Sequence, residues 1–282
     1  MKTKSRTTPF PVTPLLVVAA LLMLWGCGGE SQSDKATGSA QYVMSLLADS
    51  TGQCGDSTSP CARISYSFPE ITRCANPHVA DVINSEIQLL LLGEQTDTSD
   101  IEFVEDIISG FLLDYDKLLN DFPDYRLPWI KNVTLDVVAN GGGVLSLEYV
   151  LFEFTGGAHP NTQIQNRNFD LETGQLLTLH QLLLPGADTT LTRLAEKHFR
   201  MARQLAPDAD LAEAGFWFEN GKFVINGNFL IDLQGLTFAY NAYEIAPYSM
   251  GPTGFTVPYN ELRGLINPEG PLVGWLKVAS AH

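Results

Sequence analysis

The chain has 282 residues, of which 45% are hydrophobic and 17% are charged, and its net charge at pH 7 is −15. This composition predicts a globular protein with a sizeable core and excludes a largely disordered chain. The negative charge argues against nucleic acid as a partner, because phosphates would be repelled, but it is compatible with a basic protein partner.

The first 26 residues have the pattern of a bacterial signal peptide. Three basic residues precede an apolar run at 15–25, which is too short to cross a bilayer as a helix of about 20 residues. Leu24-Trp25-Gly26-Cys27 resembles a lipobox, with Trp25 in place of the usual small or aliphatic residue. We expect export and lipidation of Cys27, the alternative being ordinary cleavage nearby. Because Gly28 follows the cysteine, a diderm host would place the anchor in the outer membrane, facing the periplasm.

Cleavage before Cys27 removes three of the 17 basic residues and none of the 32 acidic ones, which leaves a net charge of −18. Residues 28–40 are polar and rich in Gly and Ser, as in a flexible tether. We therefore divide the chain into five parts, namely a signal peptide (1–26), a lipid-anchored tether (27–56), an N-terminal half (57–162), a C-terminal half (163–265) and a tail (266–282).

Three cysteines remain beyond Cys27, and an exported protein can keep a disulfide. Cys54 and Cys61 flank a flexible hexapeptide, so we expect this pair to be linked rather than Cys61 and Cys74. No C-x-x-C pair is present, which gives little support to a redox or zinc site.

Hydrophobic periodicity predicts alternating strands and helices in the N-terminal half. A Ser99-x-x-Glu102 capping box opens the second helix. Nine acidic residues lie between 97 and 124 with Lys117 as the one basic residue among them, which predicts a solvated helix face or a docking surface for a cationic partner. The expected elements are a strand at 63–69 that ends at proline, helices at 78–92 and from Ser99, and strands at 129–139 and 144–155.

The C-terminal half continues with a strand at 163–171, a short helix at 178–184 and a helix at 188–205 that has His198 on its apolar face, as in a core histidine. A hairpin is expected from 216–218 and 223–225 around Asn220-Gly221, followed by strands at 236–240 and 255–259. This order predicts an α+β fold with a largely antiparallel sheet and packed helices.

Two loops contain the candidate binding residues. The first follows the strand at 144–155 and contains Gly156, Gly157, His159 and Pro160. Glycines and a proline fix the chain there, and His159 either pins the turn or takes part in a site. The second is an aromatic loop with Tyr243, Glu244 and Tyr248, which is either a binding surface or a packed corner with Glu244 as a hydrogen-bonded anchor.

Three motifs in order, TGGAHPN at 155–161, FDLETG at 169–174 and YEIAPYSMGP at 243–252 followed by VPYNEL, resemble the RsiV-like family of extracytoplasmic domains over residues 60–265. The resemblance implies recognition of lysozyme or of peptidoglycan. Members of that family carry output parts that this chain lacks. Only 14 residues precede the apolar run, too few for a cytoplasmic signalling segment, so we expect no transmembrane signalling part of its own.

We expect a binding module that needs no cofactor or metal, rather than an enzyme. The chain contains no G-x-S-x-G, H-E-x-x-H or nucleotide-binding motif. The alternative is a cell-wall hydrolase that uses His159 and Glu244, since carboxylates are abundant and catalytic partners are often distant in sequence.

Overall fold

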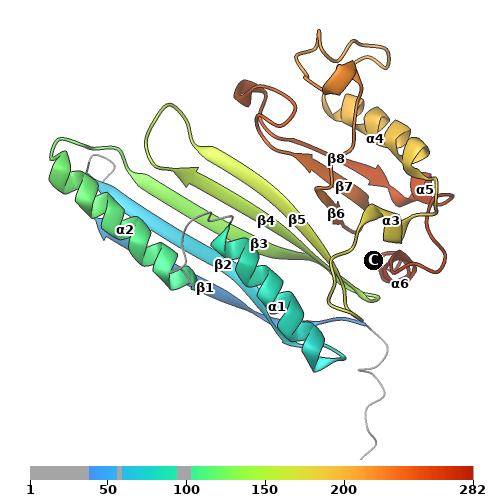
Figure 1. The fold of residues 1–282 in the computed structure, drawn as a ribbon, viewed down its shortest axis with the longest axis horizontal. Coiled ribbons are helices and arrows are strands. Elements are labelled where there is room, and N and C mark those ends of the chain that lie inside the picture. Colours follow the sequence, from blue (N-terminus) through green and yellow to red (C-terminus); the bar gives the residue numbers. More distant parts are fainter. Residues whose placement is uncertain (1–37, 56–58, 94–102, 282) are drawn as a thin grey trace, which may run out of the picture.

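The computed structural model describes residues 38–55, 59–93 and 103–281. Its larger layer is a five-stranded sheet in the order β1-β2-β3-β4-β5 (Figure 1). Neighbouring strands are antiparallel except β2 and β3, which are parallel because two helices lie between them in the sequence. The strands are β1 (Gln41–Gly52), β2 (Cys61–Arg73), β3 (Trp129–Gly141), β4 (Val144–Phe154) and β5 (Asn161–Asp170).

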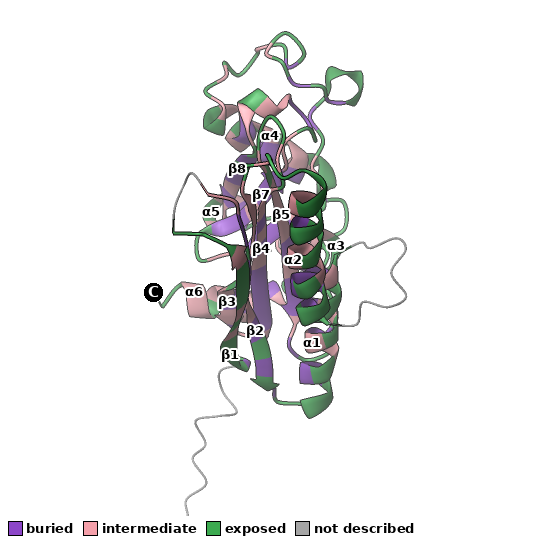
Figure 2. Cartoon of the chain, turned by 90° about the vertical axis from the view of Figure 1, so that its left-hand side faces the viewer, coloured by how far each residue is buried: buried purple, intermediate pink, exposed green. Residues whose placement is uncertain are grey.

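Helices α1 (Pro77–Leu92) and α2 (Val104–Asp121) cover one face of this sheet, and the C-terminal helix α6 (Leu272–Ala279) lies on the opposite side (Figure 2). The side chain of Asn76 caps α1, and Pro77 begins it, where a missing N–H costs nothing. The core between sheet and helices is apolar, with Ile64, Tyr66, Ile83, Val133 and Leu135 almost fully buried.

The C-terminal half contains a second, three-stranded antiparallel sheet in the order β6-β7-β8. Phe199 of α4 is buried in the core beside this sheet, at the centre of an aromatic cluster. Five rings have centroids 5.0–6.4 Å from the Phe199 ring, namely those of Phe216, Phe218, Phe223, Tyr240 and Phe255. Such tilted and edge-on pairs add to the free energy gained by burial. The elements are α3 (Leu179–Leu182), α4 (Asp188–Ala202), β6 (Phe229–Ile231), β7 (Gly235–Tyr240), β8 (Thr253–Pro258), α5 (Tyr259–Leu262) and α6 (Leu272–Ala279).

The α+β class and the largely antiparallel pairing are confirmed. β5 spans the position at which we divided the chain, and it belongs to the five-stranded sheet. The tether was expected to reach residue 56, but β1 lies within that range and pairs with β2, so residues 41–52 are part of the sheet. Residues 266–282 include α6, whose Leu272 and Trp275 are buried in the C-terminal core. In the part of the chain that the structure describes, no helix is long and apolar enough to cross a membrane.

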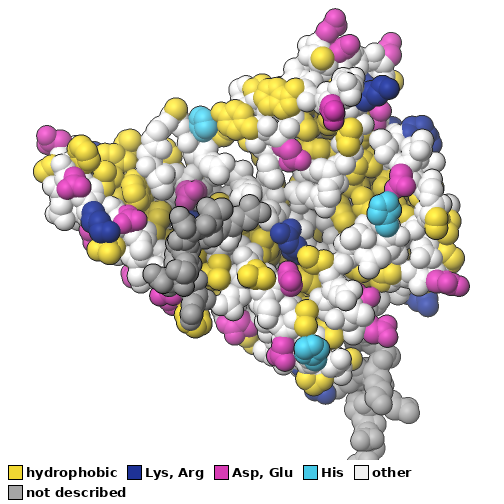
Figure 3. Space-filling model, viewed as in Figure 1, with side chains coloured by type: hydrophobic (Ala, Val, Ile, Leu, Met, Phe, Trp, Pro, Cys, Tyr) yellow, Lys and Arg dark blue, Asp and Glu magenta, His cyan; other side chains and the backbone are white. Residues whose placement is uncertain are grey.

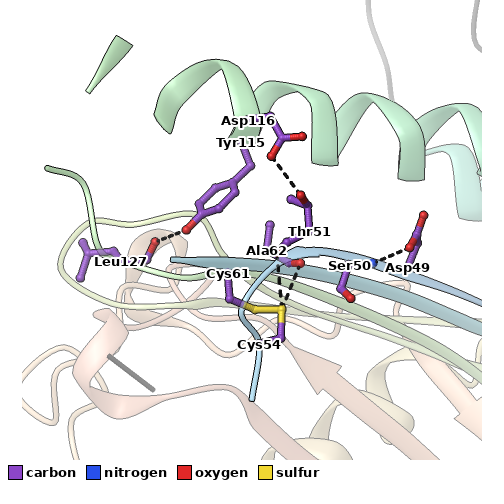
Figure 4. Close-up of a disulfide and its surroundings, with 9 residues drawn as sticks. All are labelled: Asp49, Ser50, Thr51, Cys54, Cys61, Ala62, Tyr115, Asp116 and Leu127. Atoms are coloured by element: carbon purple, nitrogen blue, oxygen red, sulfur yellow. Dashed lines mark hydrogen bonds between the residues drawn. A yellow bond between two sulfur atoms is a disulfide. The ribbon is translucent and has the colours of Figure 1, made fainter. Parts of the chain in front are cut away.

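The expected Cys54–Cys61 disulfide is present (Figure 4). It joins the end of β1 to the start of β2. Helix α2 contacts the same end of the β1–β2 pair, where Thr51 Oγ1 donates a hydrogen bond of 3.0 Å to Asp116. Cys74 is a free, buried cysteine. Burial raises the pKa of its thiol.

Two predictions about strands are wrong. β2 does not end at Pro69 but continues to Arg73. Since β3 pairs with β2 only as far as Ser67, Pro69 lies where β2 has a single neighbouring strand and a missing N–H is tolerated. The hairpin of 216–218 and 223–225 does not form. The N–H of Trp217 instead donates to the Ile245 carbonyl at 3.0 Å, and no backbone hydrogen bond among the described residues links the two segments.

His198 is not a core histidine. Its Nε2 lies 3.1 Å from Glu261, which also accepts a hydrogen bond from Lys197 at 2.9 Å. The hydrogen bond from Lys197 is the largest influence lowering the pKa of Glu261. The Ser99–Glu102 capping box and the lipidation site Cys27 lie outside the described residues.

Candidate functional site

The two loops that contain the predicted binding residues meet in space. The first, between β4 and β5, contains Gly156 and Gly157, whose φ values of +95° and +97° favour glycine. A Cβ atom at Gly156 would lie 2.6 Å from the hydroxyl of Tyr125. These two positions therefore require glycine for the path that brings His159 to the start of β5.

The second loop follows β7 and is held against the free edge of β5 by asparagine side chains. Asn241 accepts a hydrogen bond from the N–H of Ile164 at 2.7 Å and donates one to its carbonyl at 3.0 Å. Asn228 accepts from the N–H of Asn166 at 2.8 Å. Carboxamides thus replace the next strand of the sheet, and they fix the aromatic loop relative to the first loop.

The aromatic rings of the two loops are in contact. The imidazole of His159 stacks on Tyr248 with ring centroids 3.7 Å apart and an interplanar angle of 17°. Its Nδ1 lies 3.1 Å from the carbonyl of Pro160, which also accepts from the Tyr248 hydroxyl at 2.8 Å. In the neutral imidazole, Nδ1 is therefore the donor, and Nε2 can accept from the Tyr243 hydroxyl 3.4 Å away.

Trp217 is hydrogen-bonded to the second loop. Its indole N–H donates to the carbonyl of Glu244 at 3.1 Å, and half of the residue is exposed. We call His159, Trp217, Tyr243 and Tyr248 the aromatic surface. The space-filling view shows a histidine beside hydrophobic side chains along the edge where the five-stranded sheet meets the C-terminal half (Figure 3).

Tyr243 has an unusual backbone conformation for a residue with a side chain, with φ at +66°. Hydrogen bonds within the loop hold it there, from Tyr243 N–H to the Ala246 carbonyl and from Glu244 N–H to the Asn241 carbonyl, both 3.1 Å long. The conformation is unfavourable and is found at sites where the surrounding structure imposes it. It leaves 59% of Tyr243 exposed, so a large ring is presented to solvent rather than packed inward.

Glu244 is an exposed anchor of the loop. Its two carboxylate oxygens accept hydrogen bonds from the Asn226 side chain at 2.7 Å and from the Asn241 N–H at 2.8 Å. Both donors belong to asparagines. His159 and Glu244 are thus bonded to different groups, and the hydrogen bonds of the described residues do not pair them for acid–base chemistry.

Sequence reasoning missed Trp217, Asn226 and Asn241. Trp217 lies within a stretch that was expected to be a strand, and asparagines in loops give no local sign of a distant partner. Among the described residues, no group of three or more His, Cys, Asp and Glu side chains could hold a metal ion.

Two family models match parts of the chain. Residues 56–162 match the model described as "Deacetylase PdaC", and residues 181–260 match "Protein of unknown function (DUF3298)". Together these matches indicate a domain of unknown function associated with the cell envelope. No curated protein matches the chain.

Solved structures of the DUF3298 family share the fold. A member from Bacteroides fragilis has a TM-score of 0.66 and 21% identity, covering 85% of this chain and 99% of its own. A member from Pseudomonas aeruginosa has a TM-score of 0.55 and 22% identity, covering 82% of this chain and 97% of its own. At these identities the similarity concerns the fold alone, and the two loops of the candidate site must be interpreted from this chain's own residues.

Proposed function

We propose that this chain is a lipid-anchored envelope protein that binds a basic protein of the lysozyme class through the aromatic surface. The observation that carries the proposal is the contact between His159 and Tyr248, which joins two loops into one exposed group of rings. Tyr and Trp are the side chains that most often dominate the binding energy of protein–protein interfaces. They contribute large contact areas and lose little conformational entropy on binding.

Charge supports a basic partner. With the signal peptide removed, 14 basic and 32 acidic residues remain. Such an imbalance attracts a cationic protein and raises its association rate, an effect that salt screens. The resemblance of the two loops to RsiV-like domains supports the lysozyme class in particular, and anchoring at Cys27 would hold the binding surface at the membrane.

The test is a binding titration of the mature chain with hen egg-white lysozyme at two salt concentrations. We expect saturable binding that weakens as salt rises. Tyr243→Ala and Trp217→Ala should each weaken it roughly tenfold or more, the effect of losing a central aromatic contact. Tyr42→Ala is the matched control, since Tyr42 is an exposed tyrosine of β1, outside the aromatic surface, and it should change the affinity less than about twofold.

Isolated sacculi serve as a second bait, and a wall-lysis assay serves as a third measurement. Binding to sacculi without binding to lysozyme would replace the proposed protein partner by peptidoglycan. Lysis of sacculi that is lost in His159→Ala would favour the hydrolase alternative. Thermal unfolding of each variant shows whether a lost interaction reflects a lost surface or a lost fold.

A further inference from the structure

Residues 222–226 form an extended segment that leads into β6 without pairing with another strand. The chain runs there without a bend, and Lys222 has extended backbone angles (φ −106°, ψ 132°). Within the described part of the chain, no backbone hydrogen bond reaches the N–H or the C=O of Phe223 or Ile225. This strand-like segment therefore has a free edge.

The direction of that edge follows from Val224. Its carbonyl accepts a hydrogen bond of 2.5 Å from the hydroxyl of Tyr240, which lies in the C-terminal core. Successive residues of an extended chain direct their backbone groups to opposite edges. The N–H and C=O groups of Phe223 and Ile225 therefore point away from Tyr240.

A groove of about 530 Å³ lies between this segment and the residues around α3 and the start of α4. Its volume falls in the range of 300–1,000 Å³ that is typical of ligand sites. Leu177, Leu191, Phe223 and Phe229 give it apolar walls, and Thr178 and Thr192 add hydroxyl groups. Asp188 also lines it, with 69% of its side chain exposed, 3.7 Å from His180.

We propose that the groove binds an extended peptide as an added β-strand along Phe223–Ile225. The unpaired N–H and C=O groups of an extended segment are complementary to another extended backbone, and alternate side chains of an added strand enter the pockets of a groove. Apolar side chains of the peptide would face the leucines and phenylalanines of the groove. The exposed carboxylate of Asp188 favours a basic residue at one of the peptide positions that alternate with them. The proposal does not depend on the aromatic surface or on lysozyme.

The first test uses the acetylated and amidated heptapeptide in which lysine and valine alternate, titrated into the mature chain. We expect saturable binding below about 1 mM, a weak affinity for a short peptide. A peptide N-methylated at its valines and one N-methylated at its lysines separate the two edges of the added strand. Pairing uses one edge, so one methylated peptide should bind about tenfold more weakly while the other stays within about twofold. No saturable binding by the parent peptide, or equal effects of the two methylations, would overturn the proposal.

The second test changes the protein. Ile225→Pro removes the central N–H of the free edge and should weaken the parent peptide about tenfold, whereas Ile225→Val keeps that N–H and should leave the affinity within about twofold. Thermal unfolding accompanies both variants, and the methylated peptides decide the matter if Ile225→Pro does not fold.

Sedimentation velocity gives the oligomeric state of the mature chain with and without the parent peptide. A dimer that the peptide dissociates would assign the groove to a second copy and overturn the proposal of a separate peptide partner.

Discussion

Asn241 bonds to both backbone groups of Ile164, accepting from its N–H at 2.7 Å and donating to its carbonyl at 3.0 Å. One carboxamide thus takes the place of a neighbouring strand residue at the free edge of β5. The same double contact occurs twice more within the described residues, at distances of 2.8–2.9 Å, between Asn84 and Ile71 and between Asn140 and Ala40.

Replacing Asn241 should loosen the aromatic loop. Asn241→Ala removes both hydrogen bonds. The half-buried N–H of Ile164 then has no partner, whereas its carbonyl keeps the hydrogen bond from the Asn228 side chain at 2.9 Å. The free energy of unfolding should therefore fall by about 1–3 kcal/mol. Urea unfolding measures the change. Asn161→Ala, at an exposed position of the same strand, is the control and should have almost no effect. Equal losses in the two variants would show that the pairing adds nothing.

Much of the fold could be predicted from the sequence because local chemistry decides it. Helix α1 begins after Asn76 at Pro77 and ends before Gly93, as its caps indicate. The β3–β4 hairpin turns at Gly142 and Gly143, both with positive φ, between the strands predicted at 129–139 and 144–155. These features depend on neighbours in the chain, which periodicity and turn residues reveal.

The failures concern contacts between distant residues. The three phenylalanines at 216, 218 and 223 have the pattern of a hairpin, but the N–H of Trp217 pairs with the carbonyl of Ile245, which is distant in the sequence. The candidate site was predicted in part, since both loops were identified from their own residues. Their stacking, and the asparagines that fix it, depend on pairings that no local pattern records.

The carboxylates of Glu148 and Asp136 lie opposite each other on β4 and β3. Burial, and secondarily the charge of Asp136, raise the pKa of Glu148. The native state therefore binds this proton more tightly than the unfolded state does. Binding of this proton therefore stabilises the native state in full below the ordinary Glu pKa of about 4.3. The stabilisation is lost as the pH rises through the raised pKa of Glu148 in the native state.

Glu148→Gln should accordingly raise the melting temperature near neutral pH, and the gain should disappear below about pH 4. Glu153→Gln is the matched control on the same strand. Glu153 lies 3.3 Å from Lys131 with 30% of its side chain exposed, so its replacement should lower the melting temperature or leave it unchanged. A Glu148 variant that melts at or below the wild-type temperature at neutral pH would show that neither burial nor the charge of Asp136 destabilises the ionised carboxylate.

Removing the disulfide should cost a moderate amount of stability. Cys54 and Cys61 are separated by seven positions, and closing so short a loop restricts the unfolded chain by about 2–3 kcal/mol. Urea unfolding of the Cys54→Ser/Cys61→Ser double variant should show this loss, and reduction of the wild type should reproduce it. In non-reducing peptide maps, a bridge to Cys74 would contradict the structure.

Lipidation at Cys27 is expected from the apolar run that ends at Gly26. Intact-mass spectrometry of the protein purified from membranes should give a mature chain that starts at an acylated Cys27. Cys27→Ser should release the protein into the soluble fraction, because the anchor is the acylated cysteine itself. A wild-type protein that is already soluble and begins at another residue would exclude the lipid anchor.

Glu244→Gln separates the structural role of this residue from a catalytic one. The backbone N–H of Asn241 can donate to the new amide oxygen, but the amide nitrogen would then face the Nδ2 group of Asn226. Asn226 cannot rotate its amide freely, because its Nδ2 also donates to the Ala239 carbonyl and its Oδ1 accepts from the Asn228 N–H. The variant therefore brings two donors together where one bond existed.

Because the carboxylate is exposed, water compensates in part, and the free energy of unfolding should fall by about 1 kcal/mol. A buried carboxylate would lose roughly 1.5–3 kcal/mol, the range for a bond to a charged group. Binding to lysozyme should change little, since the rings of the aromatic surface remain. Thermal and urea unfolding, run beside the binding and wall-lysis assays, measure all three quantities. Unchanged stability together with abolished wall lysis would assign Glu244 to catalysis, because a catalytic carboxylate contributes to the transition state and not to the fold.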